Sequence, residues 1–162
     1  MGESRPLPDK TLLDCTAQAW TYVQRCLPHI LALYDEPYWN PDTGSGLCAH
    51  AAAWLHHLLQ QEGRSCMLAS VQGNIVGHCF VLCDGFVLDP TAMQFGADVP
   101  SVSWYDPATA PWFHQEPALH GSTRALCEHL LGLGWCDAQL PLYFLPTQTP
   151  SSTASQIVFP KM

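Results

Sequence analysis

The sequence predicts an α+β domain in which two helices precede a small antiparallel sheet along the chain. Apolar residues recur at spacings near 3.6 over 11–33, 47–61 and 122–133, and this periodicity predicts three helices. Shorter segments bounded by turn residues predict strands over 65–72, 76–83, 86–89 and 140–145. The 162 residues are enough for one domain with its own core. Helices followed by an antiparallel sheet are typical of the α+β class.

The helix over 47–61 is the best defined of the three, because its leucines, Ala51 and Trp54 form one broad apolar face. Gly63 follows it and predicts the end of the helix, since glycine readily adopts the left-handed backbone of a helix C-terminus. The helix over 11–33 contains Pro28, which lacks a backbone N–H, and we therefore expect a break there.

The pair Asp84-Gly85 predicts a two-residue hairpin turn, because a type I′ turn needs positive φ at both of its central residues. With these turn residues, the strands pair Cys83 with Phe86, Leu82 with Val87, Val81 with Leu88, and Phe80 with Asp89. Side chains alternate across a strand. One face of the hairpin then carries His78, Phe80, Leu82, Val87 and Asp89, and the other carries Cys79, Val81, Cys83, Phe86 and Leu88.

Residues 1–145 are expected to form a single domain. A segment rich in Pro, Ser and Thr follows over 146–162 and predicts a C-terminal tail, within which 157–159 has the composition of a short docked strand. The segment 98–120 contains four prolines and several aromatic residues, and we expect a long loop there.

The composition argues against two classes of partner. The formal charge is −8 and only six basic residues occur, which disfavours a nucleic-acid binder because phosphate contacts need clustered Lys and Arg. No apolar run approaches the roughly 20 residues that cross a bilayer. The start of the chain is polar and does not read as a secretory leader. We therefore expect a cytoplasmic protein with reduced cysteines, or one delivered into another cell.

Cys48 is the candidate nucleophile, because it lies in the first turn of the helix over 47–61, where Ser45 can cap the helix. The unpaired amide N–H groups and the dipole at that end favour a negative group, so they lower a thiol's pKa. The same N–H groups can bind an oxyanion. The structural alternative is that Cys48 is only a small buried apolar residue.

His78 and Asp89 are the candidate partners of this thiol. The hairpin register makes them diagonal neighbours on one face, a separation that a hydrogen bond between the two side chains can close. Asp89 would then fix the imidazole tautomer, and His78 would accept the thiol proton and return it to a leaving amine. The alternatives are a half-buried structural histidine and an aspartate that only shapes the turn before Pro90.

The run Gly46-Leu47-Cys48, the strand Gly77 to Val81 and the run Asp89-Pro90-Thr91-Ala92-Met93-Gln94-Phe95 resemble the papain-like and transglutaminase-like cysteine enzymes. The last run is especially similar to compact bacterial glutamine deamidases of the effector or toxin type. The resemblance covers 40–96. It implies a central helix that bears the nucleophile, packed on a small antiparallel sheet, with Cys48 as nucleophile, His78 as base and Asp89 as orienting residue.

The chain departs from this pattern at the oxyanion donor. Papain-like enzymes carry a glutamine six residues before the nucleophile, where this chain has Asp42, and a carboxylate would repel an oxyanion. Gln94, Gln72, Asn40 and the amide of Cys48 are the candidate donors in its place.

The resemblance implies a thiol-dependent amide hydrolase, with glutamine deamidation of a protein or peptide substrate as the leading activity. A cysteine protease or a transglutaminase would use the same three residues, and an inactive protein-binding module on this fold is the alternative from another class. We expect no cofactor and no metal site, because the chain contains no Cys-x-x-Cys pair and its adjacent histidines, His56 and His57, point to different sides of their helix. The sequence leaves the oligomeric state open.

Overall fold

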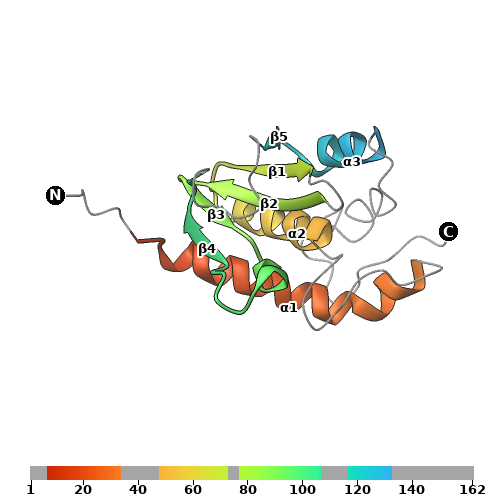
Figure 1. The fold of residues 1–162 in the computed structure, drawn as a ribbon, viewed down its shortest axis with the longest axis horizontal. Coiled ribbons are helices and arrows are strands. Elements are labelled where there is room, and N and C mark those ends of the chain that lie inside the picture. Colours follow the sequence, from red (N-terminus) through yellow and green to blue (C-terminus); the bar gives the residue numbers. More distant parts are fainter. Residues whose placement is uncertain (1–6, 34–47, 73–76, 107–116, 133–162) are drawn as a thin grey trace.

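The fold of residues 7–33, 48–72, 77–106 and 117–132 is described by a computed structural model, which shows a mixed arrangement of helices and one antiparallel sheet (Figure 1). The α+β class predicted from the sequence is confirmed. The elements in chain order are α1 (Lys10–Leu33), α2 (Cys48–Gln61), β1 (Cys66–Gln72), β2 (Gly77–Cys83), β3 (Phe86–Leu88), the 3-10 helix η1 (Ala92–Phe95), β4 (Val102–Trp104), β5 (Ala118–His120) and α3 (Thr123–Gly132).

The sheet has five strands in the order β4-β3-β2-β1-β5, and every pairing is antiparallel. The β2–β3 hairpin has the predicted register, with Cys83 opposite Phe86, Leu82 opposite Val87 and Val81 opposite Leu88. Both turn residues have positive φ, 54° at Asp84 and 84° at Gly85, as the turn type requires. The assigned strand ends at Leu88, one residue before Asp89.

Two expectations for individual segments were wrong. The segment 98–120 is not one long loop, because β4 pairs with β3 and β5 pairs with β1 at the two edges of the sheet. Helix α1 does not break at Pro28 but continues to Leu33. A proline deletes one backbone hydrogen bond, and here the helix on either side of it persists. The expected strand over 140–145 and the tail over 146–162 lie outside the described residues.

Local signals fix the helix ends. The Oδ1 atom of Asp9 accepts the Leu12 N–H at 3.1 Å at the start of α1, and the Ser122 hydroxyl accepts the Ala125 N–H at 3.1 Å at the start of α3. Helix α2 ends as predicted at Gly63, where φ is 75° and the next N–H, from Arg64, returns to the Leu59 carbonyl at 2.9 Å. These caps determine where the helices begin and end relative to the sheet.

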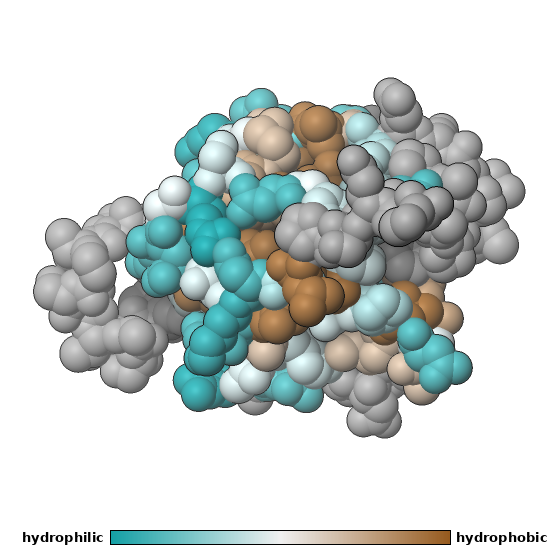
Figure 2. Space-filling model, turned by 90° about the vertical axis from the view of Figure 1, so that its left-hand side faces the viewer, coloured by the Kyte–Doolittle hydropathy of each residue, from teal (hydrophilic) through white to brown (hydrophobic). Residues whose placement is uncertain are grey.

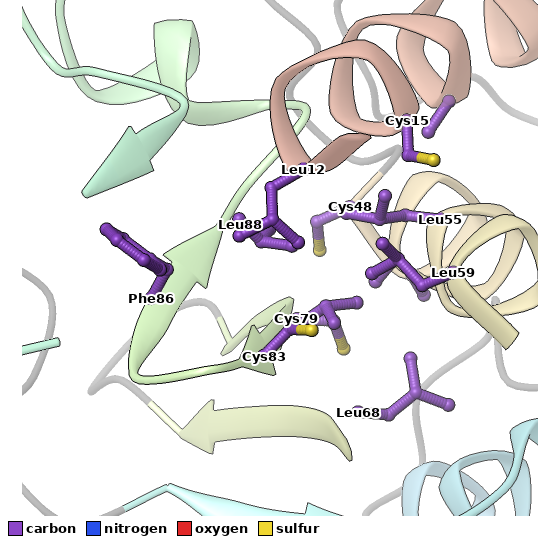
Figure 3. Packing of buried hydrophobic residues seen from close by; sticks show 14 of the residues in the cluster. Leu12, Cys15, Cys48, Leu55, Leu59, Leu68, Cys79, Cys83, Phe86 and Leu88 are labelled. Carbon is purple, nitrogen blue, oxygen red and sulfur yellow. The ribbon is translucent and has the colours of Figure 1, made fainter. Parts of the chain in front are cut away.

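The main core lies between the helices and one face of the sheet. It contains the five residues that the hairpin register assigned to this face, together with apolar residues of the helices (Figure 3). The opposite face carries a smaller cluster of Ala69, Val71, Phe80 and Val87. Both faces of the central strands are therefore apolar, and this explains why β1 and β2 contain so few charged residues.

Arg64 joins three parts of the chain at the end of the molecule where the hairpin turns. Its guanidinium lies 2.7 Å from Asp9, before α1, and 3.0 Å from Asp84 in the turn. Figure 2 looks at this end and shows hydrophilic residues around a smaller apolar area. None of the described helices is long and apolar enough to cross a membrane.

Replacing Gly85 with alanine is expected to destabilise the protein more than the same change at Gly63. Both glycines have positive φ, which costs alanine about 1–2 kcal/mol. A Cβ at Gly85 would also lie 2.7 Å from the Trp104 ring, and such overpacking costs about 1–3 kcal/mol more. A Cβ at Gly63 meets no atom within 4 Å. Urea unfolding of both variants measures the difference, and equal losses would show that Trp104 moves aside freely.

Candidate active site

Cys48 is the first residue of α2, and its side chain is buried at 6 % exposure. The amide groups of the first helical turn have no acceptor within the helix, so this end of α2 carries partial positive charge. The chain therefore places a thiol where a negative charge is stabilised. Ser45, the expected cap, lies outside the described residues.

His78 and Asp89 are in direct contact, as the hairpin register predicted. The Nε2 atom of His78 lies 2.7 Å from Oδ2 of Asp89, and the two side chains are 3 % and 1 % exposed. An imidazole nitrogen that faces a carboxylate carries the proton, so the neutral tautomer has its hydrogen on Nε2. Nδ1 is then the ring nitrogen at which the imidazole takes up a second proton.

Three hydrogen bonds fix the position of Asp89. Its backbone N–H donates to the Ser101 carbonyl at 2.7 Å and thereby extends the β3–β4 pairing by one step. Its other carboxylate oxygen, Oδ1, accepts the Thr91 N–H at 3.1 Å and the Thr91 hydroxyl at 3.3 Å. Thr91 is completely buried. Both oxygens of the carboxylate are therefore held, and only Oδ2 faces the imidazole.

The local electrostatics favour a charged His78. Burial alone lowers the pKa of an imidazole, but the charge of Asp89, its hydrogen bond and the contact with Cys48 outweigh that effect and raise the pKa of His78 to about 10. At neutral pH the ring is consequently an imidazolium.

The pKa of Cys48 moves in the opposite direction. A hydrogen bond from the Cys79 thiol, a hydrogen bond from His78 and the imidazolium charge lower the pKa of Cys48 well below its usual range, although burial opposes them. Since Nε2 of His78 faces Asp89, the contact with Cys48 falls to Nδ1. His78 is thus hydrogen-bonded to Asp89 and acts on the charge of Cys48, so the three side chains form one electrostatically coupled group.

The sequence analysis did not identify two residues that lie beside Cys48, His78 and Asp89. Cys79 lies on the helix-facing side of β2, in the same core cluster as Cys48 (Figure 3). Hydrogen bonding by its thiol and its backbone N–H helps to lower the pKa of Cys48. Thr91 lies two residues after Asp89, a spacing at which an aspartate commonly accepts the backbone N–H. That local signal was present in the sequence, whereas the position of Cys79 depended on how α2 packs on the sheet.

Of the three side chains considered as oxyanion donors, the structure brings Gln94 to the site. Its Nε2 atom lies 3.0 Å from the Thr91 hydroxyl and 3.5 Å from Nδ1 of His78. Gln72 is the last residue of β1, and its side chain is not among those described. Asn40 lies outside the described residues.

Two aromatic rings flank the imidazole. Phe80 stacks beside it with ring centroids 5.9 Å apart, and Phe95 meets it edge-on at 4.7 Å. Phe80 is fully buried, but Phe95 is 40 % exposed and Gln94 is partly exposed. Of the described residues around His78, those of η1 are therefore the ones that reach the protein surface.

Within the part of the chain that the structure describes, no group of three or more His, Cys, Asp or Glu side chains is arranged to hold a metal ion. Comparisons with protein-family models, curated proteins and solved structures gave no match to this chain. The site combines a thiol of lowered pKa, an imidazolium that can return a proton, and a fixed carboxylate that holds the imidazolium.

Proposed function

We propose that the protein is a thiol-dependent amide hydrolase that uses Cys48 as nucleophile, His78 as acid and base, and Asp89 as the residue that orients His78. The observation that carries this proposal is the 2.7 Å hydrogen bond between His78 and Asp89, together with a thiol at the start of α2 whose pKa His78 helps to lower. Cysteines without such partners have a raised pKa here, as the partly buried Cys66 and the buried Cys83 do.

The reaction follows from the charges of the resting pair. The Cys48 thiolate attacks the carbonyl carbon of a carboxamide, and the carbonyl electron pair moves onto oxygen. When the tetrahedral intermediate collapses, the C–N bond breaks and the nitrogen leaves as ammonia or an amine with the proton of His78 Nδ1. A water molecule then attacks the thioester while His78 accepts its proton, which releases a carboxylic acid and the thiolate.

The substrate class that we propose is a glutamine side chain in a protein or peptide, which the reaction converts to glutamate. The support is the similarity of the run Asp89–Phe95 to compact glutamine deamidases of the papain-like and transglutaminase-like group, together with a helix bearing the thiol against an antiparallel sheet. Cleavage of a peptide bond and transfer to an amine are alternative outcomes of the same thioester.

An inactive protein-binding module is the second candidate. The observation in its favour is the 6 % exposure of Cys48, because a nucleophile must be reached by its substrate. The two candidates differ in what they require of the thiol: an enzyme needs a reactive thiolate, and a binding module does not.

Cys48 is expected to be alkylated by iodoacetamide much faster than the other cysteines near neutral pH, because its lowered pKa makes it a thiolate there. Cys66 and Cys83 are internal controls, since burial raises their pKa values to about 11 and about 12. Peptide mass spectrometry at several pH values gives a rate for each cysteine. The onset for Cys48 should lie below the reference pKa of about 8.5.

The same measurement on His78→Ala separates the two candidates. Without the imidazolium, Cys48 should lose its advantage at neutral pH and react only at higher pH. Ammonia release from an N-protected glutaminyl peptide then tests the substrate class, and this activity should decline as the pH rises through about 10, where His78 loses its proton. A Cys48 that reacts no faster than Cys66 would support the binding module instead.

A further inference from the structure

The Thr91 side chain contacts both the orienting carboxylate of Asp89 and the candidate donor Gln94. Its hydroxyl lies 3.3 Å from Oδ1 of Asp89 and 3.0 Å from Nε2 of Gln94. A hydroxyl has a single hydrogen. Because the carboxylate can only accept, this hydrogen points to Asp89, and the hydroxyl oxygen accepts from the Gln94 amide. The Thr91 hydroxyl therefore determines which end of the Gln94 carboxamide faces the site.

The Gln94 amide has a second N–H, and this group lies beside the reacting pair. Nε2 is 3.5 Å from Nδ1 of His78, the ring nitrogen that does not face Asp89. When Nδ1 carries a proton it can no longer accept a hydrogen bond. In the thiolate–imidazolium state the second N–H of Gln94 is consequently available to another acceptor next to the thiolate.

We propose that Gln94 supplies a side-chain N–H to the carbonyl oxygen of the substrate, and that Thr91 is the positioning residue that aligns Gln94 and Asp89 together. The inference rests on the proposed thiol chemistry and assigns the donor that it needs. The partial exposure of Gln94 and its neighbour Phe95 is consistent with contact to a substrate that arrives over η1. The glutamine that papain-like enzymes place before the nucleophile is replaced by this one, 46 residues after Cys48.

Two reactions of Cys48 distinguish an oxyanion donor from a residue that only supports the fold. Alkylation by iodoacetamide is a displacement at saturated carbon and forms no oxyanion. Acylation by p-nitrophenyl acetate passes through a tetrahedral oxyanion, which expels p-nitrophenolate and leaves a thioester on Cys48. An oxyanion donor therefore accelerates acylation and leaves alkylation nearly unchanged.

The test measures both rates in Gln94→Ala and in Gln94→Met, a variant of similar length without a donor. We expect the p-nitrophenol burst to slow by about 100-fold, the usual loss for one oxyanion donor, while alkylation of Cys48 stays close to the wild-type rate. Thr91→Val keeps the side-chain shape but removes the hydroxyl, so acylation and alkylation should both slow, alkylation by about tenfold. Thr91→Ser should restore both rates. Thermal unfolding of each variant confirms that it is folded.

Each of the other possible results contradicts one part of this proposal. If the Gln94 variants acylate at the wild-type rate, Gln94 is not the donor. If they lose alkylation and acylation equally, Gln94 acts only on His78, and the donor assignment fails as well. If Thr91→Ser does not restore the rates, the hydroxyl is not what aligns the site. A wild-type protein whose Cys48 forms no acyl-enzyme would instead refute the proposed function.

Discussion

Replacing Asp89 with asparagine is expected to lower the rate of amide hydrolysis by about 10⁴-fold, the loss seen when a catalytic histidine is held in the wrong tautomer. The reason is that two hydrogen-bond donors point to the Oδ1 atom of Asp89. Thr91 presents its N–H and its hydroxyl there, so the single oxygen of an asparagine amide would face Thr91. The amide nitrogen would then face Nε2 of His78 and force the ring proton onto Nδ1, which could not accept the proton of Cys48.

The effect of Asp89→Asn is measured on the reactivity of Cys48 as well as on the hydrolysis of a substrate. In Asp89→Asn, the onset of iodoacetamide alkylation should move toward the pH of an ordinary thiol, because the imidazolium loses its carboxylate. Asp98→Asn is the matched control, since it removes the same charge from an exposed position after η1. If Asp89→Asn keeps wild-type alkylation at neutral pH, Asp89 does not orient His78.

Replacing Phe80 with alanine is expected to reduce the free energy of unfolding by about 3–5 kcal/mol. Among the described residues, Phe80 is the largest completely buried side chain, and it packs with Ala69, Val71 and Val87 on the face of the sheet away from the main core. Loss of the ring would leave a cavity between strands that cannot easily close. Because domains of this size are stable by only about 5–15 kcal/mol, the shift in the urea midpoint should be large.

Leu82→Ala provides the comparison for this variant. Leu82 lies two residues further along β2 on the same face, but it is only partly buried, so its loss should cost clearly less than the loss of Phe80. The Phe80 ring also stacks beside His78, so Cys48 alkylation should be followed in both variants. Equal destabilisation by the two changes would contradict a well-packed cluster around Phe80.

The β2–β3 hairpin shows why part of the site was predictable. A two-residue turn fixes the register of both strands, and the register fixes which side chains share a face. The turn at Asp84-Gly85 therefore predicts, without any knowledge of the packing, that His78 and Asp89 are neighbours. The 2.7 Å contact between their side chains agrees with this register. The helix that starts at Cys48 was equally readable from its apolar face and from Gly63.

The edge strands could not be predicted in the same way. The strands β4 and β5 have three residues each and lie within a segment whose prolines indicate a loop. Such short strands exist because a neighbouring strand offers hydrogen bonds, not because of their own propensity. The contact of Cys79 with Cys48 likewise arises from the way α2 packs on β2, and no spacing in the sequence encodes that.

The short edge strands also bear on how the protein behaves at high concentration. Exposed strand edges template pairing with other chains, and proteins counter this with charged side chains or with short edges. Charged residues make up only 12 % of this chain, so protection by charge is weak. In the described part of the sheet, β4 and β5 are each too short to offer a long row of unpaired backbone groups. The geometry of its two outermost strands thus limits edge-to-edge aggregation where the composition does not.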